Sequence, residues 1–315
     1  MTHPSRRRFV ATTAASAVAL TLPPALHAQD QASTSAEPTK GWIDAHVHVW
    51  TPDIKTYPLD EHFSVADMQP PSFTPGELLS QCQPEGVERV VLVQMSFYGY
   101  DHSYLLQAMK QHPGRFSGVA LIDVNAPNLL TQVDELAASG LRGFRLHSMN
   151  DADRWVDNPG MDRLWRTAGE KGLAICPLIN PGDIPYVETL CKKFPDTTVV
   201  VDHFARIGVS GTIESQALDQ LCGLARFPNT YVKTSAFYAL GKKQAPHDDL
   251  IPMIRRMVDS FGPQRLMWGS DCPYQVQEGH TYHNSIALLR DRINFLTDSD
   301  KNWLLRDTAK EVFFA

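Results

Sequence analysis

Two histidines and an aspartate occupy alternate positions early in the chain. Asp44, His46 and His48 lie in the largely apolar stretch 41–50. Alternate residues of a β-strand face the same side, so the pattern predicts one face that carries a carboxylate and two imidazoles. Such a face suits a metal ion, or a proton-transfer site that holds a substrate between two rings. The alternative is a pair of structural histidines on a half-buried strand.

Other polar side chains occur where short β-rich runs of the chain end. They are Gln94, Ser96, Tyr98, Arg145, His147, Asp202, His203, Arg206, Lys233, Ser235 and Asp271. Each one alone is as readily structural as functional, but core packing would place apolar residues at most of these positions. Together they predict a single site at the same end of several strands.

The β-rich runs alternate with amphipathic helical patterns. After the first run, they cover residues 88–95, 116–122, 141–147, 173–179, 198–203, 230–236 and 266–271. Eight strands, each followed by a helix, predict an α/β fold of the (β/α)8 TIM barrel type, whose catalytic residues lie at the C-terminal strand ends. A doubly wound open sheet is the alternative. No phosphate-binding glycine motif follows an early strand, so nucleotide binding has no support.

A proline-rich connection, residues 51–73, separates the first strand from the first helix. Its four prolines exclude regular structure, so we expect a loop that covers another part of the molecule. Thr74 then predicts a helix N-cap, with Pro75 in the first turn. The five cysteines show no metal-binding or redox spacing and are interpreted as packing residues, although Cys272 directly follows Asp271.

Composition limits the class of protein and its partners. The 315 residues are 43% hydrophobic and 20% charged, as in an ordinary globular enzyme. The formal net charge is −6, and removal of the first 28 residues takes away three arginines and leaves −9. So acidic a folded part argues against nucleic acid or an anionic membrane as a partner and for a small-molecule substrate. The composition is compatible with either a monomer or a homo-oligomer.

The N-terminus resembles a twin-arginine export signal. Arg6, Arg7 and Arg8 precede a weakly apolar, Ala- and Thr-rich run that ends in small residues near Ala28. The alternative is a basic tail without a targeting role. We expect residues 1–28 to be the signal, residues 29–40 a disordered linker, and residues 41–315 a catalytic domain that acts in the periplasm.

Several motifs resemble the amidohydrolase-2 branch of the amidohydrolase superfamily. They are IDAHVHVW at 43–50, the segment 94–101, GFR at 143–145, VDHFAR at 201–206 and WGSDCP at 268–273. The nearest resemblance is to the lactonase group, typified by 2-pyrone-4,6-dicarboxylate lactonase and sugar-lactone hydrolases. It covers residues 42–315. The first and last motifs together are specific for the superfamily but say little about substrate.

The resemblance implies that His46, His48, His203 and Asp271 surround the reacting carbonyl. Metal-dependent relatives add a histidine on the fifth strand, whereas residues 175–180 here contain none. This departure argues against a two-metal site. The prediction is either no cofactor or one divalent ion, zinc by preference, held by His46, His48 and Asp271.

The chemistry predicted from these residues is the hydrolysis of a lactone. Asp271 would activate water, and the three histidines would polarise the carbonyl and stabilise the oxyanion. Substrate-binding residues, above all cations for an acidic substrate, would be Arg145, Arg206, Lys233, Ser96, Tyr98 and His147. One alternative is a metal-dependent, non-oxidative decarboxylase of aromatic or muconate-type acids. Another is a non-catalytic periplasmic barrel that binds small acids.

Overall fold

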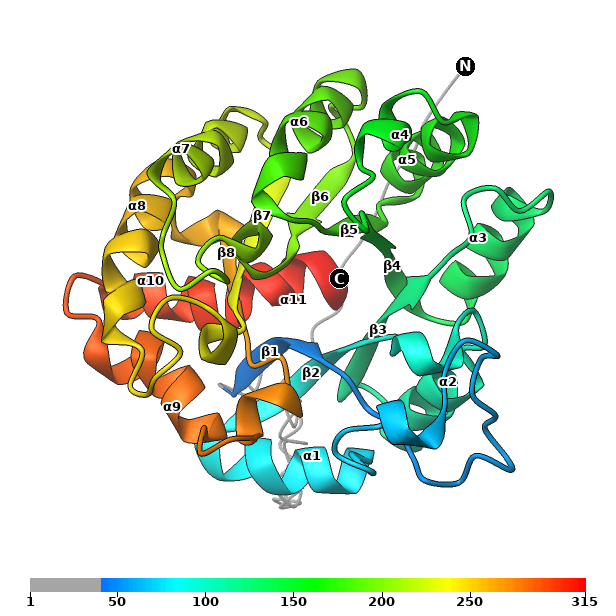
Figure 1. Cartoon of the computed structure of the whole chain (residues 1–315), viewed down its shortest axis with the longest axis horizontal. Helices are drawn as coiled ribbons and strands as arrows, with labels where there is room; N and C mark the ends of the chain where they lie inside the picture. The colour runs from blue at the N-terminus through cyan, green and yellow to red at the C-terminus, as the bar shows by residue number, and fades with distance from the viewer. Residues whose placement is uncertain (1–40) are drawn as a thin grey trace, which may run out of the picture. The chain divides into compact units, whose positions relative to one another are not determined.

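A single eight-stranded sheet forms the centre of the molecule. The computed structural model describes residues 41–315, so the predicted export signal and linker lie outside it. All strands are parallel and are hydrogen-bonded in sequence order. They are β1 (Trp42–Val47), β2 (Val87–Val93), β3 (Phe116–Leu121), β4 (Leu141–His147), β5 (Ala174–Leu178), β6 (Thr198–Val201), β7 (Thr230–Ser235) and β8 (Leu266–Gly269). This order, with helices between the strands, confirms the predicted TIM barrel (Figure 1).

The helices form a ring outside the strands, except the last one, which lies across the middle of the barrel in Figure 1 and packs against β1, β4 and β8. They are α1 (Pro75–Cys82), α2 (Ser103–Gln111), α3 (Leu129–Ala138), α4 (Asp153–Val156), α5 (Pro159–Lys171), α6 (Ile184–Lys193), α7 (Ser215–Gly223), α8 (Ile251–Phe261), α9 (Tyr282–Ala287), α10 (Asp298–Asn302) and α11 (Thr308–Phe313). The predicted cap of α1 is present, because the Thr74 side chain accepts a hydrogen bond from the backbone of Glu77. No helix in residues 41–315 is long and apolar enough to cross a membrane.

The barrel closes between β8 and β1 through residues of the predicted site. Val47 and Cys272 form a parallel bridge, and the backbone nitrogen of His48 donates to the Cys272 carbonyl at 2.8 Å. The backbone nitrogen of Asp271 donates to the His46 carbonyl at 2.9 Å. The same backbone contacts that close the barrel therefore fix the spacing between the histidines and the aspartate.

The barrel interior is filled by apolar side chains below the polar end. Ile43 and Ala45 of β1 pack there with residues of the other strands, and Ala309 and Phe313 of α11 belong to the same cluster. A larger apolar cluster lies between the strands and the ring of helices. The polar site is thus built on a rigid apolar base.

Asp44 does not share a face with the two histidines, so that part of the prediction is wrong. Its carboxylate accepts hydrogen bonds from the Ser270 backbone at 2.8 Å and the Tyr282 hydroxyl at 2.7 Å, on the side of α9. Strand register shifts between Asp44 and Val47. This irregularity breaks the alternation and lets His46 point toward the site.

β6 and β8 end earlier than predicted, because the residues that follow leave the extended conformation. His203, Phe204, Ala205 and Arg206 have φ values of 51°, 52°, 53° and 59°, and Asp271 has a φ of 63°. Non-glycine residues adopt this left-handed region at an energetic cost and are found there mostly at functional sites. The backbone turns at the two positions that supply His203 and Asp271.

Candidate active site

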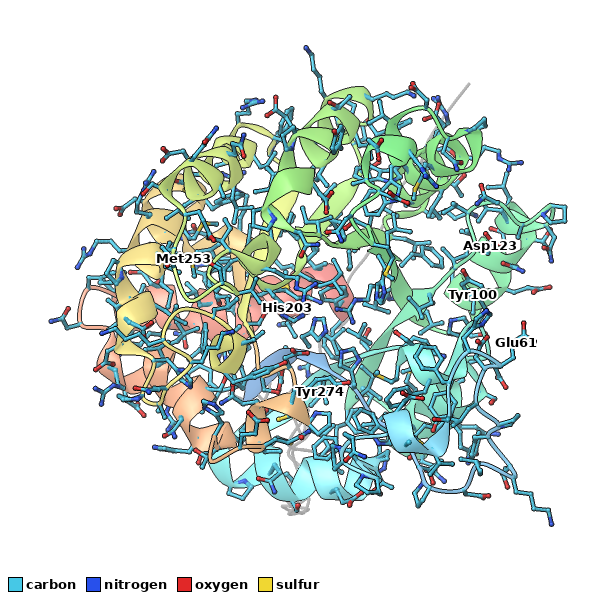
Figure 2. All side chains as sticks on the ribbon, viewed as in Figure 1. Glu61, Tyr100, Asp123, His203, Met253 and Tyr274 are labelled. Carbon is cyan, nitrogen blue, oxygen red and sulfur yellow. The ribbon has the colours of Figure 1, made fainter. Side chains whose placement is uncertain are left out.

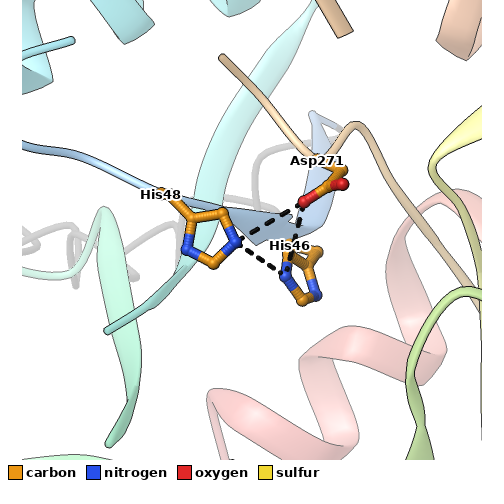
Figure 3. A group of neighbouring side chains, drawn as sticks. All are labelled: His46, His48 and Asp271. Atoms are coloured by element: carbon orange, nitrogen blue, oxygen red, sulfur yellow. Dashed lines mark hydrogen bonds and ion pairs between the residues drawn. The ribbon is translucent and has the colours of Figure 1, made fainter. Parts of the chain in front are cut away.

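Three imidazoles converge on the carboxylate of Asp271. Its Oδ1 atom lies 3.6 Å from Nε2 of His46, 3.5 Å from Nε2 of His48 and 3.9 Å from Nε2 of His203. The Nε2 atoms of His46 and His48 are 3.3 Å apart, and Figure 3 shows both rings pointing toward the carboxylate. The structure thus brings together all four residues predicted to carry the chemistry.

The outer nitrogens of two rings are held by the protein. Nδ1 of His48 lies 2.9 Å from the Val93 carbonyl, to which it must donate. Nδ1 of His203 lies 2.8 Å from the Ser235 hydroxyl. Such bonds fix the tautomer and the orientation of each ring. The Nε2 lone pair of His48 is therefore directed into the site, where Nη1 of Arg145 lies 3.3 Å away and can donate to it.

A buried network of charges supports His46 from below. Lys233 Nζ lies 3.0 Å from Nδ1 of His46 and 3.0 Å from Oδ1 of Asp202. Arg145 Nε lies 3.4 Å from Oδ2 of Asp202. Because an ammonium can only donate, its contact favours a lone pair on Nδ1 of His46 and a proton on Nε2. That N–H points toward Asp271 and the space above it.

The electrostatics leave an ionised Asp271 carboxylate beside the neutral rings of His46 and His203 at neutral pH. Burial alone would raise the pKa of Asp271, but the imidazoles around it, with His203 foremost, lower it below its usual range. Burial lowers the pKa of His203 to about 4. Burial, together with the charge of Lys233, lowers the pKa of His46 well below 6.5. Asp271 can therefore accept a proton, while the Nε2–H of His46 can donate a hydrogen bond.

His48, His203 and Asp271 line a cavity of about 300 Å³ that opens at the C-terminal ends of the strands, and His46 is buried directly behind them. Figure 2 shows His203 and Tyr274 near the middle of this end of the barrel. The residues of the predicted substrate-binding set that line the cavity are Ser96, Arg145, His147 and Arg206. Its cations suit an acidic small molecule.

The amidohydrolase family model matches residues 43–315. The chain belongs to this family. Among its relatives is an L-fucono-1,5-lactonase from Burkholderia ambifaria, 29% identical over 76% of this chain and 82% of the relative. Another is a 4-sulfomuconolactone hydrolase from Hydrogenophaga intermedia, 27% identical over 75% of this chain and 76% of the relative.

The fold of this amidohydrolase is also that of solved structures. An amidohydrolase from Burkholderia multivorans, crystallised with bound zinc, has a TM-score of 0.71 and 23% sequence identity, and the match covers 86% of this chain and 98% of that one. At this level of identity the likeness establishes the shared barrel and not a shared ligand.

Two predicted substrate-binding residues lie away from the cavity. Lys233 is fully buried beneath His46 and does not line the cavity, so it supports a ring instead of binding substrate. Tyr98 is 4% exposed, and its hydroxyl accepts a hydrogen bond from the Thr51 backbone at 3.1 Å. Cys272 is fully buried, and burial raises its pKa well above 9.0, as expected of a packing residue.

Two tyrosines that were not predicted, and Asp202, which was predicted at a strand end without a role, complete the site. The Tyr238 hydroxyl donates to Oδ2 of Asp271 at 2.8 Å, and Tyr274 lines the cavity beside it. Asp202 forms the centre of the buried charge network. The positions of Tyr238 and Tyr274 could have indicated a role in the site, because they follow the ends of β7 and β8 within a few residues.

The site has a donor set that fits one metal ion. His46, His48 and Asp271 each offer a ligand atom, and these atoms lie within 4.8 Å of one another. An ion here would take the Nε2 lone pair of His46, so its proton would move to Nδ1, which lies 3.4 Å from Oδ1 of Asp202. Tetrahedral zinc, with bonds of about 2.0–2.2 Å, places neighbouring ligand atoms roughly 3.3–3.6 Å apart. The observed separations of 3.3, 3.5 and 3.6 Å agree with this geometry. The Val93 carbonyl behind His48 is a typical outer partner of such a ligand.

Proposed function

We propose that this amidohydrolase opens the lactone ring of a small carboxylated or sugar acid. The observation that carries the proposal is an ionised Asp271 carboxylate surrounded by three imidazoles, at the edge of a cavity lined by Arg145 and Arg206. A base, hydrogen-bond donors for an oxyanion and cations for a carboxylate are what ester hydrolysis of an acidic substrate requires. The two relatives named as lactone hydrolases support the same reaction.

In the proposed mechanism, Asp271 takes a proton from water as the water oxygen attacks the lactone carbonyl. The N–H of His46 stabilises the oxyanion that forms. The tetrahedral intermediate then collapses, the ring C–O bond breaks, and the proton held by Asp271 moves to the departing alkoxide. Arg145 and Arg206 bind the carboxylate of the substrate through charge-assisted hydrogen bonds.

The proposal includes at most one metal ion. His46, His48 and Asp271 would hold it, and a bound divalent ion would supply Lewis-acid polarisation of the carbonyl. We expect activity to survive chelation largely intact, because no histidine lies in the fifth-strand stretch 175–180. Elemental analysis of the purified protein tests this point, and two tightly bound ions per chain would contradict it.

Two panels of compounds test the reaction. One contains sugar lactones, muconolactones and pyrone carboxylates, with acid release followed in a pH-stat. The other contains hydroxybenzoates, with carbon dioxide release as the readout for the decarboxylase alternative. We expect acid release from at least one lactone, lost in the Asp271→Asn variant. Carbon dioxide release alone, or binding without turnover in both panels, would overturn the proposal.

We also propose that the protein is exported to the periplasm. The support is the order of Arg6, Arg7 and Arg8, the weakly apolar run and the small residues near Ala28. Replacing all three arginines by lysine should leave an active precursor in the cytoplasm. Fractionation of cells tests this, and periplasmic accumulation of the triple variant would contradict the assignment.

A further inference from the structure

A second cavity of about 480 Å³ adjoins the first. Ser96, Arg145 and His147 line both, so the two cavities form one continuous cleft that these side chains divide. Its size lies within the roughly 300–1,000 Å³ of small-molecule sites. The far side of the second cavity is formed partly by residues of the proline-rich connection 51–73, including Asp60 and Phe63. The loop predicted to cover something therefore covers this cavity.

The charge changes sign beyond the dividing residues. Asp60 and Asp123 line the second cavity. The basic groups in its lining are Arg145 and His147, which it shares with the first cavity, and His62, which pairs with Asp60 at 2.7 Å. Tyr100 lines the same cavity as both carboxylates, and Figure 2 shows it near Asp123. Burial, and then the charges of Asp123 and Asp60, raise the pKa of Tyr100. A negatively charged group would be repelled here.

Each carboxylate retains an acceptor. Oδ1 of Asp60 accepts a hydrogen bond from Nδ1 of His62 at 2.7 Å, and Oδ1 of Asp123 accepts one from the Asn125 backbone nitrogen at 2.9 Å. Within residues 41–315, no hydrogen bond reaches Oδ2 of either carboxylate. Nε2 of His147, on the dividing wall, is buried and also lacks a partner in the described part of the chain.

Apolar and aromatic surfaces complete the second cavity. Trp155, Phe63 and Tyr100 line it together with Met149 and Met161. Tyr100 is 60% exposed and Met149 is 78% exposed, so these large side chains present free surface at the rim. A purely apolar ligand would bury the Oδ2 atoms of both carboxylates without partners, which is costly. The ligand must combine hydroxyl donors with C–H surface.

We propose that the second cavity binds a neutral, hydroxyl-rich extension of the substrate, namely a sugar unit attached to the acid whose lactone is opened. This inference rests on the proposed function for the position of the acid. Hydroxyl groups donate to Asp60 and Asp123, and the C–H face of the sugar packs on the aromatic rings. The cleft therefore suits a substrate that has an anionic group at one end and a neutral sugar at the other.

Binding of stable product acids tests the proposal. Gluconate is compared by calorimetry with cellobionate, maltobionate, lactobionate and melibionate, each of which adds one neutral sugar at a different linkage or with a different configuration. We expect at least one disaccharide acid to bind the parent protein roughly 10-fold or more tightly than gluconate, as hydrogen bonds to charged groups imply.

The double variant Asp123→Ala, Tyr100→Ala removes one carboxylate and one exposed ring from the cavity. It should bind the preferred disaccharide acid no better than gluconate while its affinity for gluconate stays at the parental value. Asp134→Ala is the control, because Asp134 lies in α3, outside both cavity linings, and forms an exposed pair with Lys171.

Two outcomes would overturn the second cavity as a sugar site. One is that the parent protein binds gluconate and all four disaccharide acids with equal affinity, or binds none of the five acids measurably. The other is equally tight binding of a disaccharide acid whose terminal sugar carries a carboxylate. Failure of the proposed function is seen separately, as absence of lactone hydrolysis, because binding of the product acids does not depend on turnover.

Discussion

The Tyr238 hydroxyl donates to Oδ2 of Asp271 at 2.8 Å, while Oδ1 of the same carboxylate faces the three imidazoles. Burial and then the charge of Asp271 raise the pKa of Tyr238 far above its usual value, so the hydroxyl stays protonated and remains a donor. The two oxygens thus have separate roles. Oδ2 is held by the tyrosine hydroxyl, and Oδ1 is free to take part in the proposed reaction.

Tyr238→Phe should lower kcat by roughly 10-fold, because the lost hydrogen bond to a charged group is worth about 1.5–3 kcal/mol and only part of it acts in the transition state. The matched control is Tyr274→Phe. Tyr274 lines the same cavity, but within residues 41–315 its hydroxyl has a single hydrogen-bond partner, the Met95 sulfur, at 3.8 Å. Steady-state kinetics decide the point, and equal effects of the two substitutions would contradict it.

Lys233→Met should destabilise the fold by about 3–5 kcal/mol, because it leaves the Asp202 carboxylate buried with the Arg145 guanidinium as its remaining cation. The double variant Lys233→Met, Asp202→Leu should recover part of that loss, since it removes the buried Lys233–Asp202 pair while Arg145 loses its Asp202 partner. Urea unfolding measures both variants. If the double variant is as unstable as the sum of the two single variants, the ion pair is not the cause.

The barrel could be predicted because apolar runs mark all eight strands. The predicted strand ends were less accurate where tertiary structure overrides the local sequence pattern. His203 and Asp271 are examples, because no local motif predicts their left-handed φ values. The prediction that Asp44 shares a face with the two histidines was wrong for a similar reason. Strict alternation assumes a regular strand, and the register shift within β1 removes that regularity.

The four central site residues could be predicted because they lie at strand ends, where a barrel gathers them. Lys233 was misplaced because strand position shows that a side chain points inward but not how deeply it lies in the barrel. Tyr238 was missed because only the folded loop after β7 brings its hydroxyl to Asp271. The second cavity depends on the path of the connection 51–73, which has no periodic pattern.

Stability should fall as the pH drops from about 6.5 to about 4, partly through His247. Burial and the stacked His280 ring lower its folded-state pKa to about 4, against the opposing charges of Asp249 and Asp248. In that window the unfolded chain binds a proton that the folded chain excludes, which favours unfolding.

His247→Asn tests this pH dependence, because asparagine does not titrate and tolerates the φ of 66° at this position. The variant should lose less stability than the parent between pH 6.5 and pH 4, by roughly 1–3 kcal/mol. Urea unfolding at a series of pH values gives both slopes. Parallel pH profiles for the parent and the variant would show that His247 does not contribute.

Arg145→Met should raise KM by roughly 10- to 150-fold, the loss of a charge-assisted pair worth about 1.5–3 kcal/mol. Arg206→Met should have a smaller effect, because Arg206 is exposed at the rim and solvent screens its charge, whereas Arg145 is 5% exposed. Kinetics with a substrate that carries a carboxylate and with a neutral analogue separate the two cases. Equal losses with both substrates would rule out a carboxylate contact.

Asp271→Asn keeps the size of the side chain and a hydrogen-bonding oxygen but cannot accept the proton of water. If Asp271 is the base, kcat should fall by roughly 100-fold or more, while KM changes little, because the arginines that bind substrate are untouched. The lowered pKa of Asp271 keeps it ionised through the acid range. The acid limb of the parent pH profile should therefore follow the imidazoles, with activity falling as the pH approaches about 4, the pKa of His203. Near-parental kcat in the Asp271→Asn variant would remove Asp271 from the reaction.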